Sequence, residues 1–209
     1  MNYTIIGAAR SGLAAALLAK SSGHDVFVSE LKAENEFNDA VKKLIEAGIE
    51  FEFGGNTEKA LVNADCIITS PGVPRKAWVI EEADKRGIPV ISELEFAWQF
   101  CQNNPLIAIT GTNGKTTVTT LTAYILNQAG KKALAVGNIG TPLSAIVRDL
   151  DLDTILVVEV SSYQLDRIRE FRPHVGIILN ISPDHLAYHG TFEDYAQTKW
   201  KTFSNMTEK

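Results

Sequence analysis

The sequence has few cysteines, no excess of positive charge and no long uninterrupted apolar run. Cys66 and Cys101 are its two cysteines, one in an apolar strand-like run and one near a helix end, so neither a disulfide framework nor a zinc site is indicated. The formal net charge of −5 leaves no basic footprint for nucleic acid. No window reaches the roughly 20 apolar residues that a membrane helix requires. These absences predict a cytoplasmic globular protein, which we expect to be a monomer without a nucleic-acid or membrane partner.

The N-terminal segment 1–23 superficially resembles a secretory signal. Arg10 and the glycines Gly7 and Gly12 interrupt its apolar run, and the pattern continues as a strand, a turn and a helix. We therefore interpret the segment as the start of a folded domain. At 209 residues the chain is long enough for one large or two small domains with a sizeable core.

Strand-like and helix-like patterns alternate along the whole chain. Gly23, Gly48 and Gly87 each follow a helical pattern as a stop signal. Such alternation predicts an α/β fold, with parallel sheets and helices on their faces. The expected strands are 4–7, 25–30, 49–53, 66–70, 89–92, 106–109, a strand within 131–140, 154–165 and 174–186. We expect a Rossmann-like N-terminal domain over residues 1–93 and a P-loop-type α/β central domain over residues 94–209.

The organising motif is LIAITGTNGKTT at 106–117. Its apolar start predicts a buried strand, its two glycines a loop, and the following VTTLTAYILNQAG a helix. In that order, backbone N–H groups and the helix N-terminus face an anion, Lys115 adds positive charge, and the Thr116 hydroxyl can face Mg²⁺. A plain strand–helix turn is the alternative. The residues expected to cradle the phosphates of ATP are Gly111, Thr112, Asn113, Gly114, Lys115, Thr116 and Thr117.

The spacing of this motif differs from that of an ordinary P-loop. The usual first glycine lies five residues before the second, which would place it at Ile109. The sequence has Gly111 instead, so the motif is a variant, TGTNGKTT.

The segment GAARSG at 7–12 resembles a dinucleotide-binding turn in which Ala9 replaces the middle glycine. Its backbone and the following helix can still approach a diphosphate, and Glu30 is placed to meet a ribose or a base edge. NAD, FAD and a nucleotide-sugar diphosphate all fit such a turn. Tight turn packing of the glycines and a solvated Glu30 are the alternatives. SPGVP at 70–74 also ends a strand, where open α/β sheets bind ligands, although it can equally be a turn without a ligand.

Charged side chains follow the later strands. Glu159 ends an apolar run, where a carboxylate is costly unless paired, and we expect it to hold a Mg²⁺ that bridges nucleotide phosphates. His185 follows the next run as a metal ligand, a phosphate-side donor or an ordinary loop histidine. Lys199 falls one turn after Tyr195 on an expected helix with Thr191 as N-cap and Asp194 at the capping-box position. Taken alone, Lys199 suits a solvated lysine.

Together these segments resemble the Mur ligases of peptidoglycan synthesis. The resemblance rests on GTNGKTT at 111–117, VGNIG at 136–140, VVEVSSYQLD at 157–166, NISPDHLAYHG at 180–190 and the following YAQTKWKTF, with GAARSG and ITSPGVP in the first half. The Glu-x-Ser-Ser-Tyr-Gln-Leu form is similar to that of the members that add D-glutamate to UDP-N-acetylmuramoyl-L-alanine.

The resemblance implies an ATP-dependent ligase that forms an amide through an acyl phosphate, with two Mg²⁺ sites. It implies that Lys115 stabilises the transferring phosphate and that Lys199 is carbamoylated to an anion that can hold Mg²⁺. The family often has Asp where this sequence has Glu30. The implied metal ligands are Thr116, Glu159, His185 and Lys199, the catalytic residues are Lys115, Asn138, His185 and Lys199, and the substrate contacts are Arg10, Ser11, Glu30, Lys32, Gly72 and Asn138.

The family has three domains, so the resemblance also implies that the central domain is incomplete here. We expect the C-terminal domain, with most of the D-glutamate site, to be absent, and the fragment to bind the UDP-sugar without catalysing ligation. The rival interpretations are an NAD-dependent oxidoreductase, a non-catalytic nucleotide-binding module, another Mur-type ligase and a folylpolyglutamate synthase relative. The last lacks a UDP-binding N-terminal domain, which makes residues 1–93 the discriminator.

Overall fold

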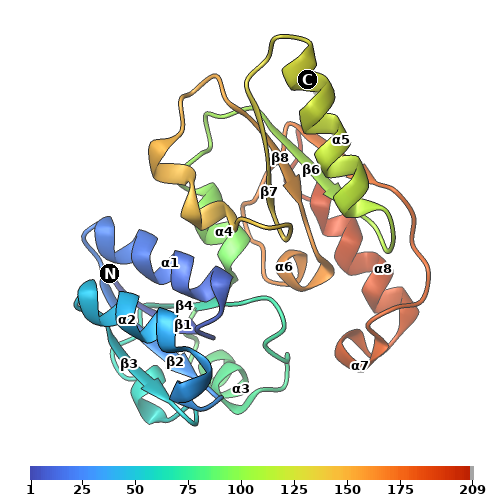
Figure 1. The fold of residues 1–209 in the computed structure, drawn as a ribbon. Coiled ribbons are helices and arrows are strands. Elements are labelled where there is room, and N and C mark those ends of the chain that lie inside the picture. Colours follow the sequence, from blue (N-terminus) through green and yellow to red (C-terminus); the bar gives the residue numbers. More distant parts are fainter. Residues whose placement is uncertain (208–209) are drawn as a thin grey trace.

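The computed structural model describes residues 1–207, which form two parallel β-sheets with helices packed around them (Figure 1). All strand pairs in both sheets are parallel, which confirms the predicted α/β fold. No helix within these residues combines the length and the apolar character that crossing a bilayer would need.

The first sheet has the strand order β3-β2-β1-β4-β5. Its strands are β1 (Asn2–Ile6), β2 (Asp25–Glu30), β3 (Glu50–Phe53), β4 (Cys66–Thr69) and β5 (Val90–Ser92), and its helices are α1 (Arg10–Ser21), α2 (Asn38–Glu46) and α3 (Trp78–Lys85). The chain builds outward from β1 to β3 and then returns to add β4 and β5 on the other side of β1. The order therefore reverses between β1 and β4, and ligands of open α/β sheets bind beyond the carboxyl ends of strands at such a point.

The second sheet has the order β7-β8-β6-β9. Its strands are β6 (Leu106–Thr110), β7 (Ala133–Gly137), β8 (Ile155–Glu159) and β9 (Val175–Ile178), and its helices are α5 (Lys115–Gln128), α6 (Ser162–Asp166), α7 (Leu186–His189) and α8 (Phe192–Trp200). Strand β6 lies between β8 and β9, and the loop that leaves it leads into α5. That helix packs against β6, β7 and β8.

Two strands are shorter than the sequence predicts. The predicted strand 154–165 has Glu159 at its end, as expected, because β8 ends there. The prediction is wrong for the residues after it, where a capping box starts α6 and Ser161 and Gln164 exchange backbone and side-chain hydrogen bonds. The predicted strand 174–186 is also wrong beyond Ile178, where β9 ends. Leu165 of α6 is fully buried, as most residues of β8 are. The apolar pattern therefore continues past the end of the strand and does not show where the strand ends.

The start of α8 follows its predicted N-cap. The Thr191 hydroxyl accepts the backbone N–H of Asp194 at 3.1 Å. The Asp194 side chain does not complete the predicted capping box but instead pairs with Arg75 of the first half.

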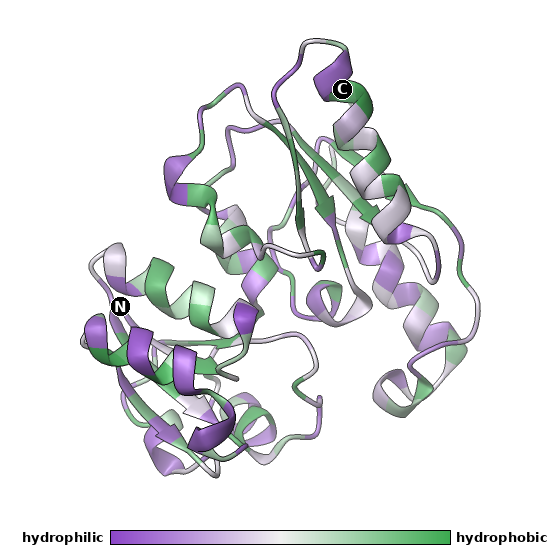
Figure 2. Ribbon diagram, viewed as in Figure 1, coloured by the Kyte–Doolittle hydropathy of each residue, from purple (hydrophilic) through white to green (hydrophobic). Residues whose placement is uncertain are grey.

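Helix α4 (Glu93–Trp98) joins the two halves of the molecule. It packs against α1, β4 and β5 on one side and against α6 and the 3-10 helix Leu143–Ala145 on the other. One apolar cluster runs from Ile5 in the first sheet through Phe96 to Val158 in the second. The strands of the second sheet are mostly apolar, whereas the surface of α5 mixes hydrophobic and hydrophilic residues (Figure 2). A domain boundary at residue 93 stays a prediction, because α4 packs against both halves.

Candidate functional site

The loop between β6 and α5 is shaped by two glycines. Gly114 caps α5 with a φ of 83°, in the left-handed region that favours glycine. A Cβ on Gly111 would lie 3.1 Å from the Cβ of Leu179, so the loop also packs closely against the segment after β9. Asn180 fastens this contact, because its side chain accepts the N–H of Asn113 at 2.9 Å and donates to the Asn113 carbonyl at 3.0 Å.

Lys115 folds back over the loop. Its Nζ donates to the carbonyls of Gly111 at 3.0 Å and Thr112 at 2.8 Å. The Thr112 hydroxyl in turn accepts the N–H of Ser182 at 2.9 Å. The positive charge is thereby held beside the N-terminus of α5, where the free N–H groups of a helix attract anions.

Glu159 lies beside this loop at the end of β8 and is 3% exposed. Its Oε2 accepts the Thr116 hydroxyl at 2.6 Å and its Oε1 accepts the Asn138 amide at 2.9 Å. The backbone of Asn138 also donates to the Glu159 carbonyl at 2.9 Å. Three predicted residues from β7, β8 and α5 therefore meet in one hydrogen-bonded group.

Lys199 is buried rather than solvated, with 1% of its surface exposed. Its Nζ donates to the Gly111 carbonyl at 2.9 Å and lies 4.6 Å from the centre of the Tyr195 ring. Burial and the nearby Lys115 lower the pKa of Lys199 to about 8, although Asp184 opposes this shift. An amine with such a pKa is partly neutral near pH 8 and can act as a nucleophile.

His185 lies at the start of α7, on the exposed side of the same region. Its backbone is left-handed, with a φ of 53°. Its Nε2 lies 3.5 Å from Asp184, and its ring lies 5.0 Å from the Tyr163 ring and 6.2 Å from the Tyr195 ring, measured between centroids. Tyr195 therefore contacts both Lys199 and His185.

The donor set around the loop suits one magnesium ion. Mg²⁺ takes oxygen ligands and usually binds through one or two protein groups together with phosphates and waters, which the Thr116 hydroxyl and the Glu159 carboxylate satisfy. Within residues 1–207, no three His, Cys, Asp or Glu side chains gather closely enough to hold a metal by themselves. Any ion here would depend on a bound nucleotide for its remaining ligands.

The turn after β1 is packed tightly. A Cβ on Gly12 would lie 1.8 Å from the carbonyl oxygen of Gly7, so α1 starts in contact with the turn. Glu30 accepts the N–H of Ala8 at 2.7 Å and the N–H of Lys32 at 2.9 Å. Its carboxylate therefore ties the end of β2 to the turn, a contact that the sequence did not predict.

A pocket of about 360 Å³ opens at this turn, between the ends of β1, β2 and β4. Three of the predicted substrate contacts line it, namely Glu30, Lys32 and Gly72, together with Gly7 of the turn. A smaller pocket of about 180 Å³ lies next to it and is lined by Arg10 and Ser11 of the first half and by Asn138 of the second. The Arg10 guanidinium crosses between the halves and donates to the Gly140 carbonyl at 2.9 Å. The predicted substrate contacts thus adjoin the Glu159 group.

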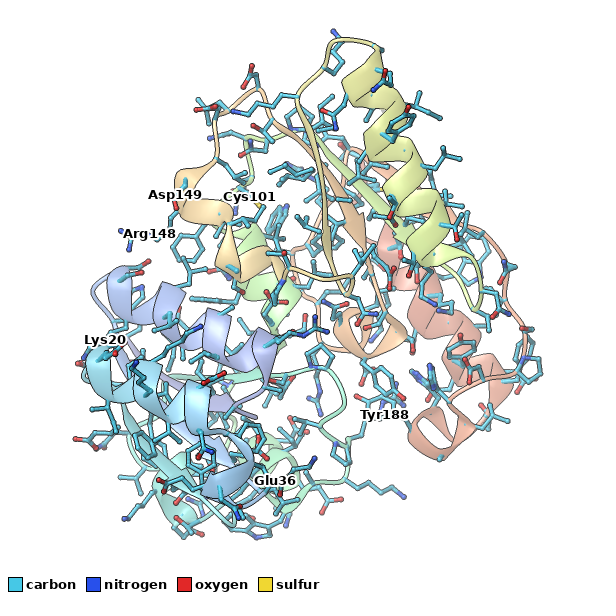
Figure 3. The ribbon with its side chains drawn as sticks, in the orientation of Figure 1. Lys20, Glu36, Cys101, Arg148, Asp149 and Tyr188 are labelled. Atoms are coloured by element: carbon cyan, nitrogen blue, oxygen red, sulfur yellow. The ribbon has the colours of Figure 1, made fainter. Side chains whose placement is uncertain are left out.

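A third pocket, of about 670 Å³, lies between α1 and the 3-10 helices that follow β7. Lys20, Arg148 and Asp149 line it, and all three lie on the same side of the molecule (Figure 3). Tyr188 lies on the opposite side of the molecule (Figure 3). Of the predicted site residues only Arg10 reaches this third pocket.

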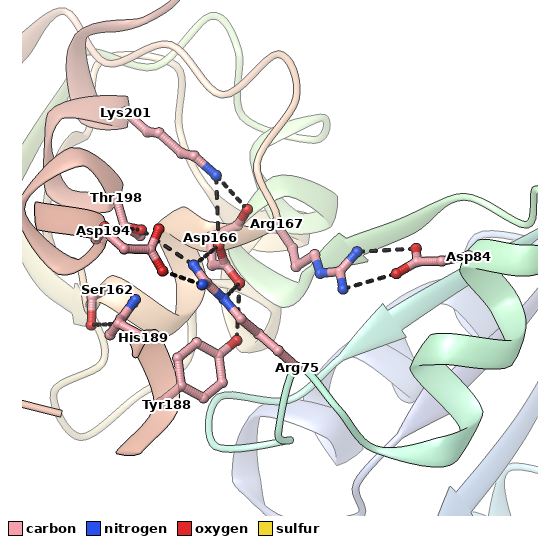
Figure 4. Close-up of polar contacts among 10 residues, drawn as sticks. All are labelled: Arg75, Asp84, Ser162, Asp166, Arg167, Tyr188, His189, Asp194, Thr198 and Lys201. Carbon is pink, nitrogen blue, oxygen red and sulfur yellow. Dashed lines mark hydrogen bonds and ion pairs between the residues drawn. The ribbon is translucent and has the colours of Figure 1, made fainter. Parts of the chain in front are cut away.

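Three charged residues with extensive contacts were not predicted from the sequence. The Arg75 guanidinium pairs with Asp166 and Asp194 across the junction between the halves (Figure 4). Glu95 is buried in α4 and accepts three successive backbone N–H groups, from residues 169, 170 and 171, each at 2.9 Å. Glu93, two residues earlier, is fully buried and accepts the N–H of Ser144 at 2.8 Å, and burial raises its pKa. Of these three residues, only Arg75 could have been suspected from the sequence, because it directly follows the SPGVP segment.

Both halves of the chain match models of known protein families. Residues 1–92 match the model of the Mur ligase MurD-like N-terminal domain, and residues 109–209 match that of the Mur ligase middle domain. This chain belongs to the Mur ligase family. The resemblance noted in the sequence is thereby confirmed.

Relatives of one specificity match almost the whole chain. UDP-N-acetylmuramoylalanine–D-glutamate ligase of Salinibacter ruber is 46% identical over 211 residues, which cover 98% of this chain and 45% of the relative. The enzyme of the same name from Streptococcus uberis is 44% identical and covers 97% of this chain and 45% of its own length. The chain thus spans a little less than half the length of these Mur ligases.

Solved Mur ligases have the same fold. The UDP-N-acetylmuramate–alanine ligase of Thermotoga maritima superimposes with a TM-score of 0.57 and 25% identity, over 99% of this chain and 47% of that one. UDP-N-acetylmuramate:L-alanyl-γ-D-glutamyl-meso-diaminopimelate ligase from Neisseria meningitides superimposes with a TM-score of 0.63 over 100% of this chain and 69% of that one, at 18% identity. The second likeness concerns the fold alone.

Proposed function

We propose that this chain is the UDP-sugar-binding and ATP-binding part of a ligase that joins D-glutamate to UDP-N-acetylmuramoyl-L-alanine at the expense of ATP. The observation that carries the proposal is the 41–46% identity to ligases of that name along nearly the whole chain, including both binding loops. The reaction activates the substrate carboxylate by phosphorylation, and the amine of D-glutamate then displaces the phosphate. It takes place in the cytoplasm, in a monomer.

In this proposal residues 1–93 hold the UDP end of the substrate. The 360 Å³ pocket has the backbone of the Gly7–Gly12 turn on one side and Gly72 on the other. Lys32 lines the same pocket and supplies positive charge for a diphosphate. Arg10 and Ser11 then face the sugar in the smaller pocket, whose far wall includes Asn138. The reacting carboxylate would lie beyond Asn138, on the Glu159 side.

Residues 94–209 hold the phosphates of ATP. The loop 111–117 gives backbone N–H groups and Lys115 gives charge, so the site stabilises negative charge as it moves between oxygens. Thr116 and Glu159 would hold a Mg²⁺, which would supply positive charge to the β- and γ-phosphates. Asn138 keeps the Glu159 carboxylate oriented through its amide.

Lys199 and His185 belong to a second metal site in this proposal. Carbamoylation requires a neutral amine, and the lowered pKa of Lys199 supplies one near pH 8. The carbamate would carry a negative charge close to Lys115 and would partly neutralise the positive charge of that lysine. His185 would add an imidazole ligand from the other side of Tyr195.

Calorimetric titration of the 209-residue chain with UDP-N-acetylmuramoyl-L-alanine, and separately with ATP and Mg²⁺, tests the two binding functions. We expect saturable binding of both. Gly72→Val should weaken the UDP-sugar alone and Lys115→Met should weaken ATP alone. Absence of UDP-sugar binding by the unaltered chain would refute the role of residues 1–93. The ligation itself is tested by phosphate release that requires D-glutamate, measured on the ligase that contains this chain.

A further inference from the structure

Arg75 reaches out of the first half of the molecule into the second. It follows the SPGVP loop, and its guanidinium lies in a socket made by α6, α7 and α8 (Figure 4). Its Nε donates to Asp166 Oδ2 at 2.8 Å and its Nη2 to Asp166 Oδ1 at 2.6 Å, a two-pronged contact. Nη1 pairs with Asp194, and the guanidinium carbon lies 5.2 Å from the centre of the Tyr188 ring.

The socket is built around Asp166, whose side chain is only 8% exposed. The Tyr188 hydroxyl donates to Asp166 Oδ2 at 3.1 Å, and Lys201 donates to the Asp166 carbonyl at 2.8 Å. Burial by itself would raise the pKa of Asp166, but Arg75, Lys201 and Tyr188 outweigh it and the pKa lies below its usual value. The pair is therefore charged and satisfied across the neutral pH range.

Each helix of the socket is also attached to a proposed active-site residue. Helix α6 starts three residues after Glu159, α7 starts directly after His185, and α8 carries Lys199. Arg75 thus contacts, through a single side chain, the three helices that follow Glu159, follow His185 and carry Lys199. On its own side, it follows residues 70–74, which line the 360 Å³ pocket.

We propose that Arg75 is a positioning residue for the ligation, which fixes the substrate-binding loop against the elements that carry Glu159, His185 and Lys199. This inference rests on the proposed function. Its physical basis is that a reaction between two bound groups is sensitive to displacements of about 1 Å, and that an arginine fork restrains both distance and orientation. Lysine, with a single point charge, restrains distance only.

The other arginine contacts across the junction are weaker than that of Arg75. Arg167 pairs with Asp84 at 3.2 Å, but the Asp84 side chain is 51% exposed. Arg10 makes one hydrogen bond to a backbone carbonyl. Within residues 1–207, Arg75 alone among the arginines pairs with two carboxylates of the opposite half.

The first test measures the arrangement of the halves directly in the 209-residue chain. Spin labels on Glu46→Cys at the end of α2 and Gln128→Cys at the end of α5 report the distance between the two halves by pulsed electron resonance. The native thiols do not interfere, because burial raises the pKa of Cys66 to about 11 and that of Cys101 to about 12. We expect one narrow distance distribution, which Arg75→Met broadens or shifts and Arg75→Lys broadens less.

The matched control is Arg86→Met. Arg86 also pairs with two carboxylates, Glu82 and Glu58, but both belong to the first half. It should leave the distance distribution unchanged. An unchanged distribution in Arg75→Met would overturn the proposal. If Arg75→Met does not fold, Asp166→Asn provides the same measurement from the other side of the contact.

The second test uses the kinetics of the complete ligase. Arg75→Met should lower kcat by roughly 100-fold, while the KM values for ATP, UDP-N-acetylmuramoyl-L-alanine and D-glutamate each change by less than about threefold. Arg75→Lys should recover part of the loss, and Arg75→Met combined with Asp166→Asn should be no slower than Arg75→Met alone. A rise in KM at constant kcat would overturn the positioning role. If the unaltered ligase forms no amide, the proposed function fails, whereas the distance measurement still decides whether Arg75 fixes the two halves.

Discussion

Thr116 and Glu159 are joined by a hydrogen bond of 2.6 Å between the first turn of α5 and the end of β8. The threonine hydroxyl donates to the carboxylate, which therefore faces the glycine loop that leads into α5. The same carboxylate receives the Asn138 amide at 2.9 Å from a third element. Two donors hold Glu159 in one orientation, which places its charge at the edge of the loop and leaves little rearrangement for a cation to induce.

The first prediction concerns Glu159 as a magnesium ligand. Glu159→Gln keeps the shape and the hydrogen bonding to Thr116 but removes the charge that attracts Mg²⁺. We expect the gain in ATP affinity that Mg²⁺ provides to fall by at least about tenfold. Calorimetric titration of ATP with Mg²⁺ and with EDTA measures that gain. Glu50→Gln, at an exposed position of β3, is the control and should change neither titration. An unaltered Mg²⁺ gain in Glu159→Gln would exclude the ligand role.

The second prediction concerns Glu30 as an internal anchor. Glu30→Ala leaves the N–H groups of Ala8 and Lys32 without their acceptor. We expect a loss of about 1–3 kcal/mol in the free energy of unfolding, because these are charge-assisted bonds to a buried carboxylate. Urea denaturation measures the loss. Glu36→Ala removes only an exposed contact to Lys32 and should cost less than about 0.5 kcal/mol. Equal effects of the two substitutions would show that Glu30 anchors nothing.

The third prediction follows from the buried amine of Lys199. Folding lowers its pKa from 10.5 to about 8, so between these values the unfolded chain carries a proton that the folded chain has lost. The free energy of unfolding therefore gains a contribution as the pH rises from about 8 towards 10.5, on the order of 1–3 kcal/mol. Lys199→Met removes this contribution.

Denaturation of both proteins at pH 7.5, 8.5 and 9.5 measures the contribution as the difference between their pH dependences. The comparison cancels the tyrosines, which titrate in the same range. Parallel curves for the two proteins would mean that Lys199 titrates normally.

The fourth prediction concerns the turn at the start of α1. Gly12→Ala would place a Cβ 1.8 Å from the Gly7 carbonyl oxygen, so either the turn or the helix must move. We expect a loss of more than about 3 kcal/mol and of UDP-sugar binding. Gly55→Ala is the matched control because no atom lies within 4 Å of the added Cβ. Thermal unfolding of both variants measures the difference in stability. Similar unfolding midpoints for the two variants would contradict the close packing at Gly12.

Much of the fold follows from local patterns. Strand positions, glycine stops and the order of motifs are encoded within a few residues, and the structure has β2 at the predicted residues 25–30. Strand ends after β8 and β9 were harder to predict. Leu165 is as buried in α6 as any strand residue, so hydrophobicity continues where the backbone changes from strand to helix.

The contacts of Arg75 and Glu95 with distant parts of the chain were not predictable. Arg75 meets Asp166 and Asp194, which lie 91 and 119 residues later in the sequence. No composition or period links such positions, because the contact depends on how the two halves pack. The same holds for Glu95, whose backbone partners lie 74 to 76 residues away. The glycine loop between β6 and α5 was predictable because its signal is contained in seven consecutive residues.

The central position of β6 in its sheet has a consequence for synthesis of the protein. Its apolar residues pair with β8, where Leu106 meets Leu156, and with β9, where Ile107 meets Val175. During translation, the strand that leads into the phosphate loop has therefore left the ribosome well before either neighbour exists. Such long-range pairing is slow and leaves apolar strand edges open in the meantime. Newly made chains would then depend on chaperones for as long as β9 is unfinished.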